Sequence, residues 1–320
     1  MSYRDVRKVE LHCHQDGIAD PAMLRVMRAQ GMELPITPEA LEALYPVVDY
    51  ESFWRYMNAL APLEGDLDSF RPILAAHLER LKAQRVIYTE ISIGTSELPR
   101  DPAELIDKFQ SFRDWLTPIE DGKLQVELLI GFSRHREPAF AESIAELIAP
   151  LRRAGLIVGV LLAGPEQGNP VRPLRRAFQR FHEAGLGVEI HAGEWAGPES
   201  VWDAIDHGAP QRIGHAVAAF QDPRLLERIQ EEGIHLELCP TSNVKTGSVR
   251  RIEEHPVRLA KELGLNFSIN TDDPGPFQCS MESEFKLLEE QFGFQDEDFE
   301  KIRRDSLGAR FQPALRNGVG

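Results

Sequence analysis

The stretch Val9-Glu10-Leu11-His12-Cys13-His14 decides how this chain is interpreted. It is short and largely apolar, as expected of a buried strand. Side chains two apart on a strand point to the same face, so His12 and His14 can bind one ion together. Such a pair on its own is more often structural than metal-binding, so the rest of the chain has to supply further ligands.

Seven more apolar runs follow, most of them separated by stretches in which apolar residues recur at intervals of three and four. The predicted strands are 9–14, 86–93, 125–132, 157–163, 187–192, 212–215, 234–239 and 266–271. The predicted helices include 66–83, 137–154, 170–184, 199–207, 223–232 and 256–263. This alternation predicts an α/β fold, a closed parallel (β/α)8 TIM barrel, with a doubly wound open sheet as the alternative.

We expect residues 1–320 to form a single barrel domain with a mostly helical insertion, residues 17–85, after the first strand. That insertion is long enough to cover the barrel mouth as a lid. Within it Phe53, Trp54, Met57 and Leu60 recur at helical spacing, which indicates packing first. A lid helix could also use them to contact a ligand.

Composition excludes several classes of protein. The formal net charge of -15, from 36 basic and 51 acidic residues, argues against a nucleic-acid partner. No run of about 18 apolar residues predicts a membrane span, and residues 1–8 lack the apolar stretch of a signal peptide. Three scattered cysteines favour reduced thiols and a cytoplasmic location. Nothing in the sequence indicates the oligomeric state.

Polar residues collect at the carboxyl ends of the predicted strands, the end at which barrel enzymes build their active sites. They are His12, His14, Gly164, His191, His215, Asn243, Asp272 and Asp273. Three imidazoles and a carboxylate suit zinc, so we predict one Zn²⁺ per chain bound by His12, His14, His191 and Asp272. The same nitrogen and oxygen set also accepts iron or cobalt.

Acid–base groups accompany this ligand set. Glu194 lies three residues beyond His191, close to the ion without having to bind it, and can move protons to a substrate. His215 ends Arg212-Ile213-Gly214-His215 and is suited to orient or deprotonate a water. Asp273 follows Asp272 directly and points the other way, toward substrate. Each alone is more often structural, but together they predict one convergent catalytic site.

Six motifs in order resemble the adenosine deaminase group of metal-dependent aminohydrolases. They are ELHCHQDG (10–17), VGVLLAGPE (158–166), HAGEWAGPES (191–200), RIGHA (212–216), ELCPTSN (237–243) and NTDDPG (270–275). The resemblance implies the barrel fold and zinc-dependent hydrolytic deamination of a 6-aminopurine. Its simplest form is the conversion of adenosine or 2′-deoxyadenosine to the inosine product and ammonia.

The resemblance also implies a role for each matching residue. Glu194 resembles the proton donor to purine N1, and His215 resembles the group that positions the attacking water, alongside Asp272. Asp273 resembles the residue that bonds N7 of the base. Gly164 resembles the residue whose backbone N–H meets N3, where a glycine allows close approach.

Asp16 resembles the residue that meets the ribose 5′-hydroxyl. The implied partner is therefore a small purine nucleoside or base.

Five positions depart from the family pattern. Gln15 replaces a usual Leu, Leu161 and Pro165 replace two Asp residues, Ala216 replaces a Gly, and Ser92 replaces an Arg. None removes a metal ligand or a proton-transfer group. The Gly-Pro-Glu form of the fourth-strand motif resembles relatives that act on adenine or on 6-aminodeoxyfutalosine, which remain alternative substrates.

Two other classes stay open. A barrel hydrolase cleaving an ester, lactam or phosphotriester often uses two metals bridged by a carboxylated lysine, but the fourth predicted strand has no lysine. A zinc-binding pseudoenzyme or nucleoside-binding signalling protein would usually lack a ligand or the proton donor, and all are present here.

Overall fold

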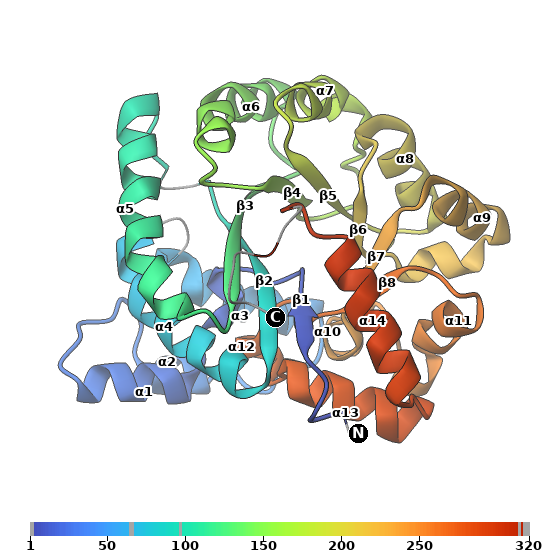
Figure 1. The fold of residues 1–320 in the computed structure, drawn as a ribbon, viewed down its shortest axis with the longest axis horizontal. Helices are drawn as coiled ribbons and strands as arrows, with labels where there is room; N and C mark the ends of the chain where they lie inside the picture. Colours follow the sequence, from blue (N-terminus) through green and yellow to red (C-terminus); the bar gives the residue numbers. More distant parts are fainter. Residues whose placement is uncertain (1–2, 64–66, 96–97, 313–314, 316–320) are drawn as a thin grey trace.

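A computed structural model describes residues 3–63, 67–95, 98–312 and 315. Eight parallel strands form one sheet in the order β1 to β8, and helices surround it as a (β/α)8 TIM barrel (Figure 1). The strands are β1 (Lys8–Glu10), β2 (Val86–Ile93), β3 (Gln125–Ser133), β4 (Gly159–Ala163), β5 (Gly187–Ala192), β6 (Arg212–His215), β7 (His235–Leu238) and β8 (Phe267–Ile269). The predicted fold class is confirmed.

Each strand from β2 onward is followed by at least one helix. The α-helices before β5 are α1 (Pro21–Ala29), α2 (Pro38–Glu42), α3 (Tyr50–Leu60), α4 (Leu67–Ala83), α5 (Pro102–Glu120), α6 (Pro138–Arg153) and α7 (Arg175–Glu183). The later ones are α8 (Pro198–Gly208), α9 (Pro223–Glu232), α10 (Pro240–Lys245), α11 (Val257–Glu262), α12 (Pro274–Phe277), α13 (Met281–Phe292) and α14 (Asp296–Gly308). Short 3₁₀ turns are η1 (Asp16–Ile18), η2 (Ala61–Leu63), η3 (Arg172–Leu174), η4 (Val217–Gln221) and η5 (Ile252–Glu254).

The first strand is shorter than predicted. It ends at Glu10, because the Leu11 N–H donates to the side-chain oxygen of Asn270 at 2.9 Å and not to the backbone of a neighbouring strand. Cys13 and His14 then make isolated bridges to Asp272 and Ser92. The hydrogen bonds from His14 N to Asp272 O and from Asp272 N to His12 O, both 3.1 Å, join the two ends of the sheet. Both histidines therefore sit in the segment that closes the barrel.

The insertion after β1 is helical, as predicted. Helix α3 crosses the carboxyl end of the barrel, where Phe53 stacks on Phe277 of α12 at 5.3 Å and the Tyr56 hydroxyl donates to the Ala19 carbonyl at 3.1 Å. Asp49 caps the helix by accepting the Ser52 N–H at 2.8 Å. The α5, α13 and α14 helices were not among the predicted ones.

The opposite end of the barrel holds a buried charge cluster. The Arg212 guanidinium lies 2.7 Å from Glu90, 2.9 Å from Glu189 and 2.7 Å from Glu237, and all four side chains are fully buried. After α14 the chain turns back across the barrel toward β4 (Figure 1) and stacks Phe311 on that guanidinium, 3.6 Å from the ring centroid. We call this group the barrel floor.

The floor requires glycine on two strands. A Cβ at Gly159 or Gly187 would lie 2.6 Å and 2.1 Å from atoms of the Phe311 ring. The glycines of the neighbouring strands β4 and β5 thus leave room for the Phe311 ring, which belongs to the segment after α14.

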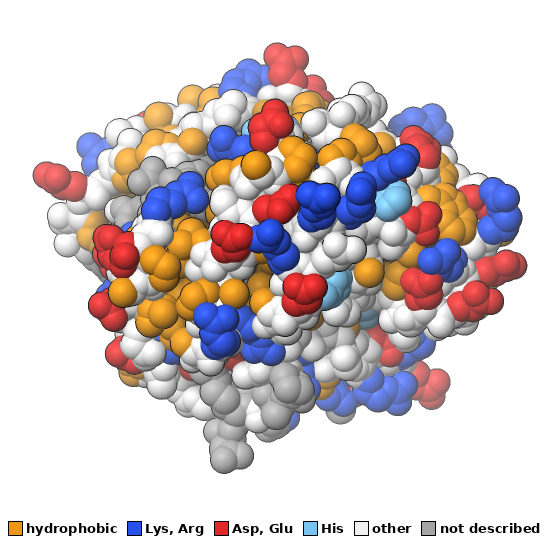
Figure 2. All heavy atoms as spheres, turned by 90° about the horizontal axis from the view of Figure 1, so that it is seen from above, with side chains coloured by type: hydrophobic (Ala, Val, Ile, Leu, Met, Phe, Trp, Pro, Cys, Tyr) orange, Lys and Arg blue, Asp and Glu red, His pale blue; other side chains and the backbone are white. Residues whose placement is uncertain are grey.

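On the outside, acidic and basic side chains are interspersed over the face in Figure 2 with no large patch of one sign. Within the described part of the chain, no helix combines the length and apolarity needed to cross a membrane.

Candidate active site

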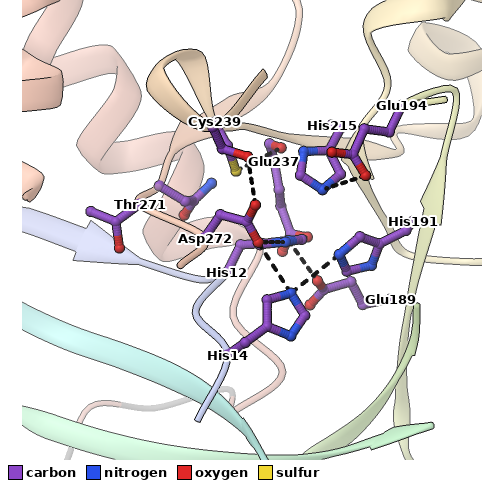
Figure 3. Close-up of polar contacts among 12 residues, drawn as sticks. His12, His14, Glu189, His191, Glu194, His215, Glu237, Cys239, Thr271 and Asp272 are labelled. Atoms are coloured by element: carbon purple, nitrogen blue, oxygen red, sulfur yellow. Dashed lines mark hydrogen bonds and ion pairs between the residues drawn. The ribbon is translucent and has the colours of Figure 1, made fainter. Parts of the chain in front are cut away.

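Four predicted ligands converge at the carboxyl end of the barrel (Figure 3). Asp272 Oδ1 lies 3.2 Å from both His12 Nε2 and His14 Nε2, and His14 Nε2 lies 3.3 Å from His191 Nε2. His12 follows β1 and His191 lies on β5, on opposite sides of the barrel. Closure of the eight-stranded sheet brings the two side chains together.

These separations fit one metal ion. Four donors at the zinc–nitrogen and zinc–oxygen bond length of about 2.0–2.1 Å, arranged tetrahedrally, lie about 3.3–3.4 Å apart. In addition, His12 Nε2 is fully buried and lacks a hydrogen-bond partner of acceptable geometry, a costly state that a coordinated cation would relieve. The donor set and its spacing therefore suit zinc.

Neighbouring groups orient three of the four ligands. His191 Nδ1 lies 3.1 Å from the Leu162 carbonyl, which fixes the proton on Nδ1 and leaves Nε2 free to bind a metal. His12 Nδ1 lies 2.8 Å from Glu189 and 3.1 Å from Glu237, with the same consequence.

A third ligand, Asp272, is also held by a neighbour. The Ser242 hydroxyl donates to Asp272 Oδ2 at 2.6 Å, which keeps Oδ1 toward the histidines.

Glu194 and His215 face each other beside the ligands. His215 Nε2 lies 3.5 Å from Glu194 Oε2, and the Asn243 amide lies 3.1 Å from His215 Nδ1, so the imidazole proton resides on Nε2. Burial, with the nearby carboxylates of Asp272 and Glu166, raises the pKa of Glu194 well above its usual range. Burial lowers the pKa of His215 to about 3. Both shifts favour the uncharged forms, a protonated carboxyl at Glu194 and a neutral imidazole at His215.

A cavity of about 290 Å³ lies in front of these groups. It is lined by Asp16, Gly164 and Asp273 as well as by His14, His191, Glu194, His215 and Asp272. The structure thus brings all nine sequence-predicted site residues to one place, with His12 directly behind the cavity. Helix α3 contributes Phe53, Trp54 and Met57 to the lining, so these side chains both pack and face the cavity.

The backbone at the site is unusual at three positions. His215, Ala216 and Asp272 have φ of 63°, 52° and 64°, the left-handed region that costs a non-glycine residue about 1–2 kcal/mol. The conformation turns His215 and Asp272 off their strand ends and into the site. It also explains why a glycine is the usual residue where this chain has Ala216.

Some site residues were missed from the sequence. Three supporting residues were not predicted. They are Glu189 and Glu237, which contact His12, and Ser242, which contacts Asp272. The signal was present in part, because both glutamates alternate with apolar residues on short strands and so face the barrel interior. Glu166 lay inside a quoted motif, and its hydrogen bonds to a distant turn depend on loop geometry that no local pattern encodes.

Comparison with known proteins finds one family over nearly the whole chain. The family model described as adenosine deaminase matches residues 7–317. An adenine deaminase of Sinorhizobium fredii is 32% identical over 311 residues, covering 96% of this chain and 94% of that protein.

Solved structures give the same fold. The adenine deaminase from Arthrobacter aurescens superposes with a TM-score of 0.83 at 26% identity, covering 96% of this chain and 94% of that one. An amidohydrolase from Burkholderia ambifaria with bound zinc superposes with a TM-score of 0.82 at 23% identity, covering 97% of this chain and 87% of that one. At this identity the similarity supports the fold and nothing more.

Proposed function

The chain belongs to the adenosine deaminase family, and on that basis we propose that it hydrolytically deaminates adenine or a closely related 6-aminopurine. The sequence favoured adenosine and 2′-deoxyadenosine. The relatives that match almost the whole chain are named adenine deaminases, which supports the alternative of adenine or a modified adenine nucleoside. The 290 Å³ cavity is at the lower limit of the range of about 300–1,000 Å³ for ligand pockets, as suits a small substrate.

We assign the metal-binding role to His12, His14, His191 and Asp272, with zinc as the ion and one ion per chain. When bound there, zinc supplies Lewis acidity that lowers the pKa of a coordinated water toward neutrality. Asp272 and His215 then orient the nucleophile, because both are locked by neighbours, Asp272 by Ser242 and His215 by Asn243.

Glu194 is the proposed proton donor. Its carboxyl, whose pKa is raised by burial, donates a proton to N1 of the purine, which makes C6 electrophilic. Water adds to C6 and the C6–N bond breaks. One of the two water protons goes to the departing amino group, which leaves as ammonia, and the other restores the Glu194 carboxyl. The products are the 6-oxopurine and ammonia.

Three residues are proposed to hold the substrate. Asp273 contacts N7, and the backbone N–H of Gly164 meets N3, where the absence of a Cβ permits close approach. A Cβ at Gly164 would lie 2.2 Å from Ser133 Oγ, so the position also has no room for a side chain. Asp16 lines the same cavity and would contact a ribose hydroxyl or, with a free base, a water in its place.

The observation that carries the proposal is the convergence of the four-ligand set, the buried Glu194 carboxyl and His215 on one cavity. The test is release of ammonia by zinc-loaded protein with adenine, adenosine, 2′-deoxyadenosine, AMP and 6-aminodeoxyfutalosine, and release of methylamine with N6-methyladenosine, with cytidine and guanine as outgroups. We expect fastest turnover with adenine or a modified adenine. Faster turnover of cytidine or guanine, or silence across the panel with zinc bound, would overturn the proposal.

A second test is the Glu194→Gln variant. It keeps the shape of the side chain and replaces the acidic carboxyl group by an amide. We expect kcat to fall by about 10²–10⁴-fold with zinc content unchanged. Equal activity of this variant would remove Glu194 from the mechanism, and loss of zinc would place its effect in metal binding.

A further inference from the structure

The carboxylate of Glu166 accepts four hydrogen bonds. Glu166 Oε1 takes the backbone N–H groups of Glu194 at 2.8 Å and Trp195 at 3.0 Å. Glu166 Oε2 takes the Gly193 N–H at 2.8 Å and the Ser200 hydroxyl at 2.6 Å. The side chain is buried, with 5% of its surface exposed, so every acceptor position is used by the protein.

These donors belong to the turn that carries Glu194. Three of them are successive backbone groups between β5 and α8, and the fourth, Ser200, lies in the first turn of α8. Gly193 has φ of 71°, and a Cβ there would lie 2.6 Å from Val201 Cγ2. Position 193 therefore requires glycine, and the Glu166 carboxylate accepts the hydrogen bonds of the turn's three amides.

The Glu194 side chain is held weakly by comparison. The Thr246 hydroxyl donates to Glu194 Oε1 at 3.4 Å and His215 Nε2 lies 3.5 Å from Glu194 Oε2, both at the long limit of a hydrogen bond. The direction of its carboxyl therefore depends on where the backbone of residues 193–195 places the Cα atom.

The loop that bears Glu166 is itself anchored. Asn169 N donates to the Glu166 carbonyl at 3.0 Å, and the Asn169 side chain donates to the Pro165 carbonyl at 3.0 Å. The buried Arg134 guanidinium donates to the Asn169 carbonyl at 3.4 Å and also to the carbonyl of His191 on β5. One connected network thus joins the loop after β4 to the strand that ends at the site.

We propose that Glu166 is a positioning residue for Glu194, fixing the turn at 193–195 so that the proton donor faces the reacting atom. This inference rests on the proposed function for its catalytic consequence. Glu166 also places a second negative charge near Glu194, in the direction that favours the protonated carboxyl.

The test is Glu166→Gln. Glutamine has the same length, but its amide nitrogen cannot accept the two hydrogen bonds that one carboxylate oxygen takes, so the turn loses part of its support. We expect kcat for the 6-aminopurine to fall by about 10–100-fold, with KM and zinc content changed by less than about threefold. Glu166→Asp, which keeps the charge but is one methylene shorter, is expected to give an intermediate kcat.

The matched control is Glu120→Gln. Glu120 is buried to a similar degree, 7% against 5%, and accepts the Val126 N–H at 2.7 Å, but at the amino-terminal end of β3. We expect this variant to lose stability and keep kcat. An unchanged kcat in Glu166→Gln, or a loss of kcat that the control reproduces, would overturn the proposal.

A second measurement separates this proposal from the assignment of function. Hydrogen exchange at the amides of Gly193, Glu194 and Trp195 is expected to accelerate at least about tenfold in Glu166→Gln and not in Glu120→Gln. That result supports the positioning role even if no purine is turned over. Unchanged exchange at these amides in a folded Glu166→Gln variant would refute it.

Discussion

Replacing Ser242 by alanine tests how much one hydrogen bond contributes to metal binding. The Ser242 hydroxyl donates to Asp272 Oδ2 at 2.6 Å, and both side chains are buried. In Ser242→Ala that carboxylate oxygen loses its donor and Asp272 can rotate away from His12 and His14. We expect weaker zinc binding with the other three ligands in place.

The magnitude follows from the contact. A hydrogen bond to a charged group contributes about 1.5–3 kcal/mol. Loss of a group that orients a metal ligand typically lowers metal affinity by about 10–100-fold. That range corresponds to about 1.4–2.7 kcal/mol, so the two estimates agree. We therefore expect the zinc dissociation constant of Ser242→Ala to rise by about 10–100-fold.

The assay is competition for zinc with a chromophoric chelator at fixed pH. Ser306→Ala is the matched control, because the Ser306 hydroxyl is equally buried and donates to the Ile302 carbonyl at 2.7 Å within α14, away from the site. The control should bind zinc as the parent protein does. If the two variants bind zinc within about threefold of each other, the orienting role of Ser242 is refuted.

Three further predictions follow from other parts of the structure. Chelation should abolish ammonia release and added zinc should restore it; activity that survives complete metal removal, verified by elemental analysis, would contradict the metal assignment. Phe311→Ala removes the ring stacked on Arg212 and should lower the free energy of unfolding by about 2 kcal/mol, measured in urea; an unchanged midpoint would rule out a stabilising floor. Burial lowers the pKa of His235 from the usual 6.5 to about 3, so between these values the unfolded chain takes up a proton that the folded chain refuses. The free energy of unfolding should therefore decrease as pH falls through this window, by at most about 1.4 kcal/mol per pH unit from this group, and His235→Gln should show a shallower pH dependence.

The strand pattern predicted the barrel well because buried parallel strands are continuous apolar runs that need no distant partner to be recognised. Seven of the eight strands lie within two residues of the predicted limits at either end. The exception is β1, because the Leu11 N–H donates to the side chain of Asn270, about 260 positions away along the chain. No window of sequence around residue 11 contains that information.

The candidate site was predicted for a different reason. Ligands and acid–base groups at strand ends must meet when the barrel closes, so chemistry alone selects them. What could not be predicted is their support. The contacts of Glu166 with residues 193–195 and of Ser242 with Asp272 depend on loop conformations, and loops carry little periodic signal.

The barrel floor also bears on the order in which the chain can fold during synthesis. The Phe311 amide donates to Glu90, 221 positions earlier, at 3.0 Å, and the Ala309 carbonyl accepts from Arg212 at 3.4 Å. Domains emerge from the ribosome amino-terminal end first, and contacts of such long sequence separation form slowly. A nascent chain that has already made β2 to β7 therefore holds Arg212 and its three carboxylates uncovered until residues 309–311 have been synthesised. We expect the strands to collapse early and the floor to close only once the segment after α14 has left the ribosome.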